Sequence, residues 1–246
     1  MAEAVKPPQV RRKEIHPLTP DQVKVLLATA AATGDRLEAL YVLAIHTGLR
    51  QGELLGLKWD DVNLDNGALR ANGVRDIRAC VEYLTAGRIA HPKRVGIMGG
   101  SYGGYMVMAG VTEYPTMFAA GANLFGVVNF ETFFRESEPW MAAISTTEYG
   151  DPATQAAMLK RLSPIHKLGR ITTPLFVLHG ANDTNVPVVE AEQIVTAMKA
   201  RGVPVKYTLF PDEGHGWRKT TNRVRSTTEI VGFFVKHLKP EGIAPQ

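Results

Sequence analysis

The sequence predicts an α/β fold in which a mainly parallel sheet carries helices on its faces and a small helical segment precedes it. Two features of the chain support this prediction. From residue 71 onward, short apolar runs alternate with stretches of helical periodicity, as strands and helices do around a parallel sheet. Before residue 71, apolar residues recur at helical spacing instead. We therefore expect a helical segment with a hairpin over residues 1–70 and a second domain over residues 71–246.

Residues 19–34 carry the signals of a capped helix. The Thr-Pro-Asp-Gln sequence at 19–22 is a capping box, in which the threonine hydroxyl and the glutamine amide can satisfy backbone N–H groups of the first turn. We expect the helix to run from residue 20 to about residue 32. Gly34 then ends it, because glycine readily adopts the left-handed conformation that closes a helix.

A second helix, a third helix and a hairpin are predicted in the rest of this segment. Apolar residues at helical spacing indicate a helix over residues 37–47, and residues 53–55 indicate a short third one. The Asp-Asn-Gly sequence at 65–67 is a hairpin turn signal, because asparagine and glycine tolerate a positive φ. We therefore expect two short strands around it, at 62–64 and 68–70.

Strands and helices are predicted in alternation along the second domain. Apolar runs indicate strands, and apolar residues three or four positions apart indicate helices. Strands are expected at 94–98, about 119–124, 175–178 and 206–210, and helices at 77–84, 190–200 and 227–238. Residues 130–161 are irregular and aromatic, and we expect loops or helices over a cleft there.

The composition is that of a globular chain without a nucleic-acid or membrane partner. The chain has 246 residues, of which 45% are apolar, and its formal net charge is only +4. Residues 1–70 hold nine Lys and Arg against nine Asp and Glu, so they form no basic stripe for phosphate binding. The amino terminus lacks the apolar run of a signal peptide, and the longest uncharged stretch, 95–112, is too rich in glycine for a membrane span. We therefore expect a cytoplasmic protein.

Ser101 is the candidate nucleophile, in the sequence Gly-Gly-Ser-Tyr-Gly-Gly at 99–104. This sequence follows a predicted apolar strand and precedes a predicted helix, which is the context of a nucleophile elbow. The tight turn needs small neighbours, here Gly99 and Gly103. Because a serine hydroxyl is a weak nucleophile at neutral pH, it also needs a base and a third group that orients the base.

Asp183 and His215 are the candidate partners of Ser101. Each follows a predicted strand, so both lie beyond the carboxyl end of a parallel strand, where ligands bind in such sheets. In this interpretation Asp183 orients His215, which takes the proton of Ser101 and returns it to the leaving group. The backbone N–H of Tyr102, at the start of a helix, is the candidate oxyanion donor.

Plain structural interpretations remain open for the residues of these loops. Asp183 could cap its loop, and His215 could be a turn residue between glycines. His179 stands at the end of the predicted strand, before the loop that carries Asp183, and is therefore interpreted as structural. Asp212 and Glu213 are interpreted as a solvated turn.

Metal and cofactor sites are not indicated. The remaining histidines show no metal-ligand spacing. Cys80 is the only cysteine, so the chain can form neither an intramolecular disulfide nor a cysteine-based metal site, and we expect a core thiol. We predict no metal ion and no cofactor.

Three separated stretches resemble one family of serine hydrolases in the same order along the chain. They are Arg-Val-Gly-Ile-Met-Gly-Gly-Ser-Tyr-Gly-Gly-Tyr-Met at 94–106, His-Gly-Ala-Asn-Asp at 179–183 with Val-Pro at 186–187, and Pro-Asp-Glu-Gly-His-Gly at 211–216. Through them, residues 73–238 resemble the catalytic half of the prolyl oligopeptidase family, especially its acylaminoacyl-peptidase-like branch. The resemblance implies a truncated α/β-hydrolase fold, a triad of Ser101, Asp183 and His215, and hydrolysis of an ester or amide through an acyl-enzyme.

The chain departs from that family before residue 73. The resemblance implies a preceding β-propeller and a first half of the hydrolase domain with a His-Gly-Gly-Pro-like loop, and neither has a match in the sequence. The second oxyanion donor is therefore unassigned. The strand at 94–98 would also keep one apolar edge unpaired, which invites pairing with another strand. We expect either that residues 1–70 cover this edge or that two chains pair through it as a homo-oligomer.

Residues 18–65 resemble an unrelated family, the tyrosine recombinases, at the start of their catalytic domain. The resemblance is sharpest at 47–57, Thr-Gly-Leu-Arg-Gln-Gly-Glu-Leu-Leu-Gly-Leu. It implies that Arg50 matches an arginine that binds the scissile phosphate and that Glu53 matches a glutamate that supports the fold around it. The later His-x-x-Arg sequence, the lysine and the tyrosine nucleophile have no match. We therefore interpret Arg50 and Glu53 as a structural ion pair in a helical segment.

The preferred functional hypothesis is an esterase for small substrates, because an open cleft would admit them and esters have better leaving groups than amides. Tyr105, Phe130 and Trp140 are candidates for its acyl pocket, and a place in the core is the open alternative for these aromatic residues. The second hypothesis is an acylaminoacyl peptidase or oligopeptidase that acts on short acyl-peptides. The third, from another class, is a DNA-associated or inactive fusion product.

Overall fold

The computed structural model describes residues 19–35, 41 and 68–239. By its internal contacts the chain divides into two compact units, Met1–Gly56 and Leu57–Gln246. The domain boundary expected from the sequence, near residue 70, stays a prediction.

Helix α1 (Pro20–Thr33) belongs to the first unit and has the predicted caps. The Thr19 side chain accepts the backbone N–H of Gln22, and the Gln22 side chain accepts the N–H of Thr19 at 2.8 Å. Gly34 follows the helix with a φ of 62°. The capped helix predicted at 20–32 is therefore confirmed.

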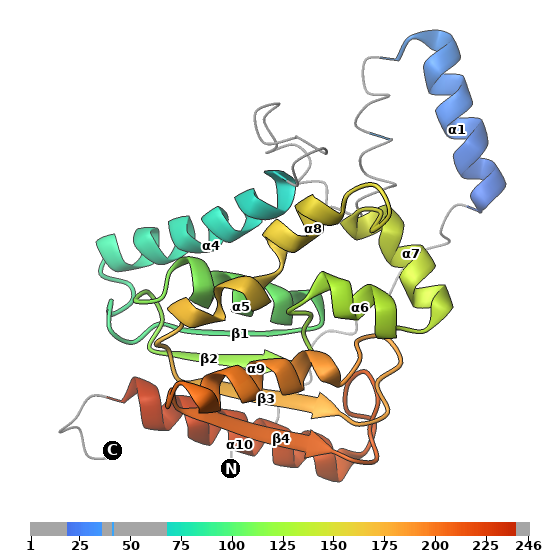
Figure 1. The fold of residues 1–246 in the computed structure, drawn as a ribbon. Helices are drawn as coiled ribbons and strands as arrows, with labels where there is room; N and C mark the ends of the chain where they lie inside the picture. Colours follow the sequence, from blue (N-terminus) through green and yellow to red (C-terminus); the bar gives the residue numbers. More distant parts are fainter. Residues whose placement is uncertain (1–18, 36–40, 42–67, 240–246) are drawn as a thin grey trace, which may run out of the picture. The chain divides into compact units, whose positions relative to one another are not determined.

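The second unit is built on a parallel sheet in which the strands follow the order β1-β2-β3-β4 (Figure 1). The strands are β1 (Gly96–Gly100), β2 (Ala120–Leu124), β3 (Leu175–Gly180) and β4 (Val205–Phe210). They confirm the four predicted strands and the α/β fold with a parallel sheet. Because the strands run in one direction, their carboxyl ends meet at one edge of the sheet.

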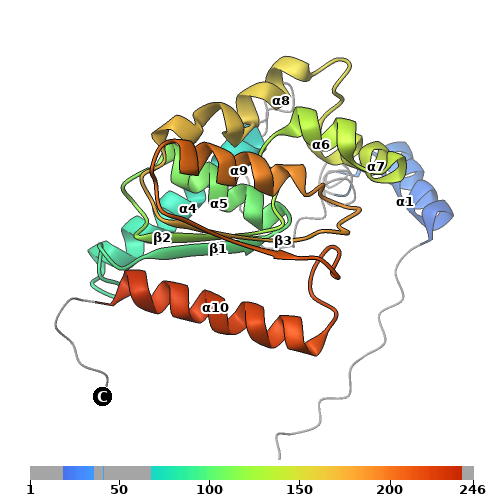
Figure 2. The same cartoon turned by 60° about the horizontal axis from the view of Figure 1, so that its bottom comes forward.

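Helices cover both faces of this sheet (Figure 2). Helix α5 (Tyr102–Glu113) packs on β1 and β2, and α9 (Val189–Ala200) packs on β3 and β4. Helix α10 (Thr220–Leu238) contacts β2 and β3 from the opposite face. Further helices of this unit are α4 (Ala68–Ala86), α6 (Phe130–Glu136), α7 (Pro139–Tyr149), α8 (Ala156–Leu162) and the 3₁₀ helix η2 (Pro164–Arg170).

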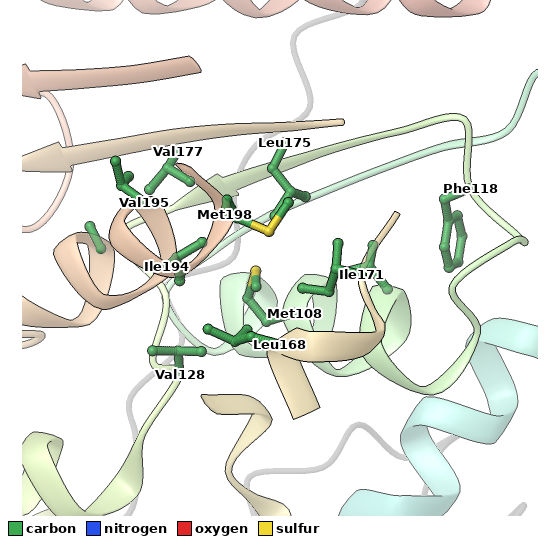
Figure 3. Packing of buried hydrophobic residues seen from close by; sticks show 12 residues of the cluster. Met108, Phe118, Val128, Leu168, Ile171, Leu175, Val177, Ile194, Val195 and Met198 are labelled. Carbon is green, nitrogen blue, oxygen red and sulfur yellow. The ribbon is translucent and has the colours of Figure 1, made fainter. Parts of the chain in front are cut away.

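The main core lies between the sheet and the helices α5, α9 and η2. Figure 3 shows Met108 of α5 and Ile194 of α9 in one cluster with Leu175 of β3. The next β3 residue, Phe176, faces the other way and packs against Phe233 of α10. Because both faces of β3 are covered, this strand is apolar at successive positions rather than at alternate ones.

The predicted hairpin is wrong in its second strand. Residues 68–70 form the first turn of α4 instead. Alanine, leucine and arginine are strong helix formers, and they continue into the helical pattern of Ile77 and Val81. The first hairpin strand at 62–64 and the helices predicted at 37–47 and 53–55 lie outside the described residues.

Two further expectations need correction. Cys80 is exposed rather than a core thiol, because the neighbouring Ile77 and Val81 are the residues of α4 that pack against the main core. The last helix begins at Thr220 rather than at residue 227, because its first turns are polar and carry no apolar signal. In the part of the chain that the structure describes, no helix has both the length and the apolar character to span a membrane.

Candidate active site

Ser101 lies in the tight turn between β1 and α5. Its φ is 57° and its ψ is −123°, and its backbone N–H donates to the carbonyl of Leu124 at 2.9 Å. A Cβ at Gly99 would lie 2.4 Å from the Gly103 carbonyl oxygen, whereas a Cβ at Gly103 would meet nothing within 4 Å. The turn therefore requires a glycine at 99 for close backbone contact, and the expectation that Gly103 must also be small is wrong on steric grounds.

The structure brings Ser101, Asp183 and His215 together. The His215 Nδ1 atom lies 2.8 Å from Asp183 Oδ2, and its Nε2 atom lies 2.9 Å from Ser101 Oγ. An ionised carboxylate only accepts hydrogen bonds, so the network assigns the proton of a neutral His215 to Nδ1. The Nε2 atom then accepts the hydroxyl of Ser101, which is the arrangement that a general base requires.

The carboxylate of Asp183 is buried and held by several donors. Its Oδ1 atom accepts the backbone N–H groups of Asn185 and Val186, each at 2.9 Å, while its Oδ2 atom faces His215. Burial acts to raise the pKa of Asp183, but the hydrogen bonds from His179, His215 and the Val186 N–H outweigh it and hold this pKa well below its usual value. Asp183 therefore stays ionised beside His215 at neutral pH.

Glu213 anchors the loop that carries His215. Its carboxylate accepts the backbone N–H groups of Arg218 and Lys219 at 2.8 and 3.0 Å. The Asn222 side chain donates to it at 2.8 Å, and the pKa of Glu213 is lowered, first by the Arg218 N–H and then by Asn222. The solvated turn predicted here is wrong for Glu213, which is 3% exposed, because its carboxylate turns inward to these donors.

The loops that carry Asp183 and His215 also hold each other. The backbone N–H of Asn182 donates to the Glu213 carbonyl at 2.9 Å, and the Asn182 side chain donates to the Pro211 carbonyl. A Cβ at Gly180 would lie 2.3 Å from the Gly214 carbonyl oxygen. Glycine at 180 therefore allows the two loops to approach closely enough for their acid and base to meet.

Phe125 is a residue of this site that the sequence analysis missed. It follows the carboxyl end of β2, has a φ of 39°, and places its ring 4.8 Å from the ring of His215 in an edge contact. Its other edge partner is Trp217, at 5.3 Å. A position directly after a predicted strand is the signal that could have pointed to Phe125, because the carboxyl ends of parallel strands converge there.

The aromatic residues proposed for an acyl pocket have different environments. Tyr105 and Phe130 are 2% and 1% exposed and belong to a core cluster, which is the alternative that the sequence left open. Trp140 of α7 is 52% exposed, and its role stays a prediction. Tyr102, the first residue of α5, stacks its ring on Tyr105 at 5.5 Å, and the oxyanion role of its backbone N–H also stays a prediction.

The other residues noted in the sequence take no part in the Ser101 contacts. Asp212 is exposed, as expected for a solvated turn. Arg50 and Glu53 lie outside the described residues. Within the described ranges, no group of three or more His, Cys, Asp or Glu side chains could hold a metal ion, and the expected absence of metal and cofactor stays a prediction.

The sequence has relatives among known peptidases. Residues 40–241 match the model of the prolyl oligopeptidase family. The dipeptidyl aminopeptidase BIII of Pseudoxanthomonas mexicana is 35% identical over 188 residues, which are 74% of this chain and 27% of that protein. The acylamino-acid-releasing enzyme of Arabidopsis thaliana is 28% identical over 192 residues, 75% of this chain and 25% of that protein. The chain thus spans about a quarter of the length of these relatives.

Solved structures share the fold. A puromycin-hydrolyzing peptidase of Mycobacterium tuberculosis has a TM-score of 0.64 at 29% identity, over 70% of this chain and 26% of that one. An acylaminoacyl peptidase of Pyrococcus horikoshii has a TM-score of 0.62 at 25% identity, over 70% and 29%. These matches confirm the truncated α/β-hydrolase fold. The family match begins at residue 40, before the start near residue 73 that the sequence predicted. It overlaps the segment that resembles tyrosine recombinases, and that resemblance stays a prediction.

Proposed function

We propose, because the chain belongs to the prolyl oligopeptidase family, that Ser101 is the nucleophile of a serine hydrolase that works through an acyl-enzyme. The single observation that carries this proposal is the unbroken hydrogen-bond path from Asp183 through His215 to Ser101. A nucleophile, a base and a group that orients the base are the elements that serine acyl transfer requires.

The path defines the proton transfers. As Ser101 Oγ attacks the acyl carbon, His215 Nε2 takes its proton, and the ionised Asp183 stabilises the imidazolium that forms. His215 then gives this proton to the leaving amine or alcohol. In the second half-reaction His215 takes a proton from the attacking water and returns one to Ser101, so the enzyme is regenerated.

The oxyanion of the tetrahedral intermediate lies beside the start of α5. The backbone N–H of Tyr102 follows Ser101 directly and sits at the positive end of the helix dipole. A donor at this position stabilises the charge that develops on the acyl oxygen. We propose Tyr102 as one oxyanion donor and leave the second unassigned.

The proposed substrates are short peptides or acylated amino acids that are cleaved at an amide bond. The names of the relatives support this choice, since they describe a dipeptidyl aminopeptidase, an acylamino-acid-releasing enzyme and a puromycin-hydrolyzing peptidase. The peptidase interpretation therefore replaces the esterase as the first candidate. An esterase stays the second candidate, because the Ser101–His215 bond is exposed and esters are the easier acyl donors.

The deciding experiment compares wild type, Ser101→Ala and Ser226→Ala. The substrates are an acetylated amino-acid p-nitroanilide, a dipeptide p-nitroanilide and a short p-nitrophenyl ester. We expect the wild type to cleave an anilide, and Ser101→Ala to lose about 10⁴-fold or more in kcat. The control is Ser226, whose hydroxyl donates to the Arg223 carbonyl within α10. The kcat of Ser226→Ala should stay within about twofold of wild type, because this side chain takes no part in the proton transfer.

Each result has a distinct meaning. Turnover of the ester alone would move the esterase to first place. If Ser101→Ala keeps the turnover of the wild type, Ser101 is not the nucleophile. Without any turnover by the wild type, a salt-dependent gel shift on duplex DNA would favour the third hypothesis, a DNA-associated or inactive product.

A further inference from the structure

His179, one residue before the end of β3, is fully buried next to the acid of the proposed triad. Its Nε2 atom lies 2.9 Å from the carbonyl oxygen of Val186 and 3.5 Å from Asp183 Oδ2. A carbonyl oxygen carries no proton, so the hydrogen of this contact belongs to His179 Nε2. The N–H at Nε2 therefore donates to the Val186 carbonyl and also lies close to the Asp183 carboxylate.

One residue of the loop, Val186, is held at both of its backbone polar groups. The Val186 N–H donates to Asp183 Oδ1 at 2.9 Å, and the Val186 carbonyl accepts the N–H of His179. His179 itself stands on β3, which is paired with β2 and β4 and is buried at each of its positions. The ring thus connects a rigid strand to the loop that aims Asp183 at His215.

We propose that His179 is a positioning residue that fixes the Asp183 carboxylate toward His215 through the single N–H at Nε2. This inference rests on the proposed function, since it assigns Asp183 to a working triad. His179 touches neither the substrate nor Ser101 and acts only through Asp183.

The second ring nitrogen of His179 has no such contact. Its Nδ1 atom is buried and finds no hydrogen-bond partner among the described residues. The nearby carboxylate of Glu190 is occupied by the N–H groups of Val128 and Asn129, at 2.8 and 2.7 Å, and by the hydroxyl of Thr132. Of the two ring nitrogens, only Nε2 therefore makes a hydrogen bond to a described residue. A different side chain that supplies an N–H at the position of Nε2 should be able to replace His179.

Three substitutions separate the two nitrogens. Glutamine places its amide nitrogen near the position of Nε2, asparagine places its amide nearer to Nδ1, and leucine supplies no donor. We expect His179→Gln to keep kcat within about threefold of wild type. His179→Asn and His179→Leu should lose about 10- to 100-fold in kcat with KM within about twofold, because a misaligned acid slows the chemical step and leaves substrate contacts unchanged.

The pH profile distinguishes positioning from a merely structural role. The charged groups facing His179 are Asp183, in the adjoining loop, and Glu190, from α9, while His215 faces Asp183 from the loop after β4. Without the N–H of His179, the negative charge of Asp183 acts more strongly on His215. The acid limb of the kcat/KM profile should therefore move to higher pH in His179→Leu and stay in place in His179→Gln.

The controls keep the failures apart. His166→Leu, an exposed histidine on η2, should match wild type in activity. If folded Asn and Leu variants keep wild-type kcat, or if His179→Gln loses as much as His179→Leu, the inference is overturned. Should the Asn and Leu variants fail to fold, the Gln variant still decides, because it must remain active.

A wild type without turnover would instead contradict the proposed function. The inference would then be tested by the low-field proton signal of the Asp183–His215 bond in NMR spectra of the same chain. We expect this signal in wild type and in His179→Gln, and its loss in His179→Asn. A signal that is equally strong in His179→Asn would overturn the inference.

Discussion

At the scale of the residue, Ser101 is held in a conformation that its type rarely adopts. A positive φ in a non-glycine residue costs on the order of 1–3 kcal/mol and persists only where the surroundings determine it. Here the Ser101 N–H is bonded to the Leu124 carbonyl, and its own carbonyl accepts the N–H of Tyr105. The close approach of Gly99 to Gly103 completes the turn and presents the hydroxyl to His215.

Gly99 and Gly103 form a matched pair for testing this turn. Gly99→Ala should lower the free energy of unfolding by about 1–3 kcal/mol, because its Cβ would overlap the Gly103 backbone. Gly103→Ala should leave it unchanged or raise it by up to about 1 kcal/mol, since alanine is the better helix former and has free space there. Urea denaturation followed by circular dichroism measures both. Equal stabilities of the two variants would contradict the steric account.

At the scale of the element, α10 is tied to β4 by a carboxylate. Glu229 of α10 accepts the Thr208 hydroxyl at 2.9 Å and pairs with Lys206 at 2.8 Å and with Arg225 at 2.7 Å. Burial acts to raise the pKa of Glu229, but the bonds from Lys206, Arg225 and Thr208 lower it to about 2. Because the pKa of Glu229 is lower in the folded state than in the unfolded state, its ionised carboxylate stabilises the fold at any pH above the unfolded-state pKa. This stabilisation is lost as the pH falls through about 2.

Glu229→Gln should therefore reduce the free energy of unfolding at pH 7 by about 1 kcal/mol, the magnitude of a favourable surface ion-pair network. The difference from wild type should shrink as the pH falls from 4.5 toward about 2, where the wild-type carboxylate becomes protonated. Thermal unfolding across this range checks the sign. Glu82→Gln, which removes the exposed Arg78 pair on α4, is the control and should change stability by no more than about 0.5 kcal/mol. A pH-independent difference for Glu229→Gln would contradict the linkage.

At the scale of the whole molecule, β1 is an edge strand of the described sheet. It pairs with β2 on one side, and Met98 of β1 is 58% exposed. An exposed strand edge is a template for another strand. Residues 1–18 and 42–67, which belong to the segment expected to cover this edge, lie outside the described residues, so both expected solutions stay predictions. The cytoplasmic location stays a prediction as well.

Of the two expected solutions, pairing of two chains through the β1 edge predicts self-association. Light scattering should then show a mass that rises with concentration, and Met98→Lys should lower it, because a charge at the edge of a sheet discourages pairing. The exposed Ile144→Lys on α7 is a matched control that should leave the mass unchanged. A strictly monomeric chain in which the β1 amides exchange quickly would contradict both pairing and covering.

The sequence predicted the strands well, and it singled out the three residues that the structure brings together, because both are encoded locally. The strand at 175–178 is an apolar run, and Ser101, Asp183 and His215 each stand in a short sequence with a recognisable context. Local signals can also compete: residues 68–70 flank a turn sequence and are strong helix formers, and their helical propensity prevails in α4.

Chemical identity and order along the chain were thus determined by the sequence itself. Only the tertiary structure decided which side chains meet, since Ser101 and His215 are 114 positions apart and His215 and Asp183 are 32 apart. It also decided that Glu213 turns inward, that Tyr105 and Phe130 are core residues, and that His179 reaches the Val186 carbonyl. The physical reason is that the spacing of apolar residues along the sequence shows only which face of a single helix or strand is buried. The parallel pairing of β1 to β4 is what brings the carboxyl ends of the strands, and the loops that follow them, to one edge of the sheet.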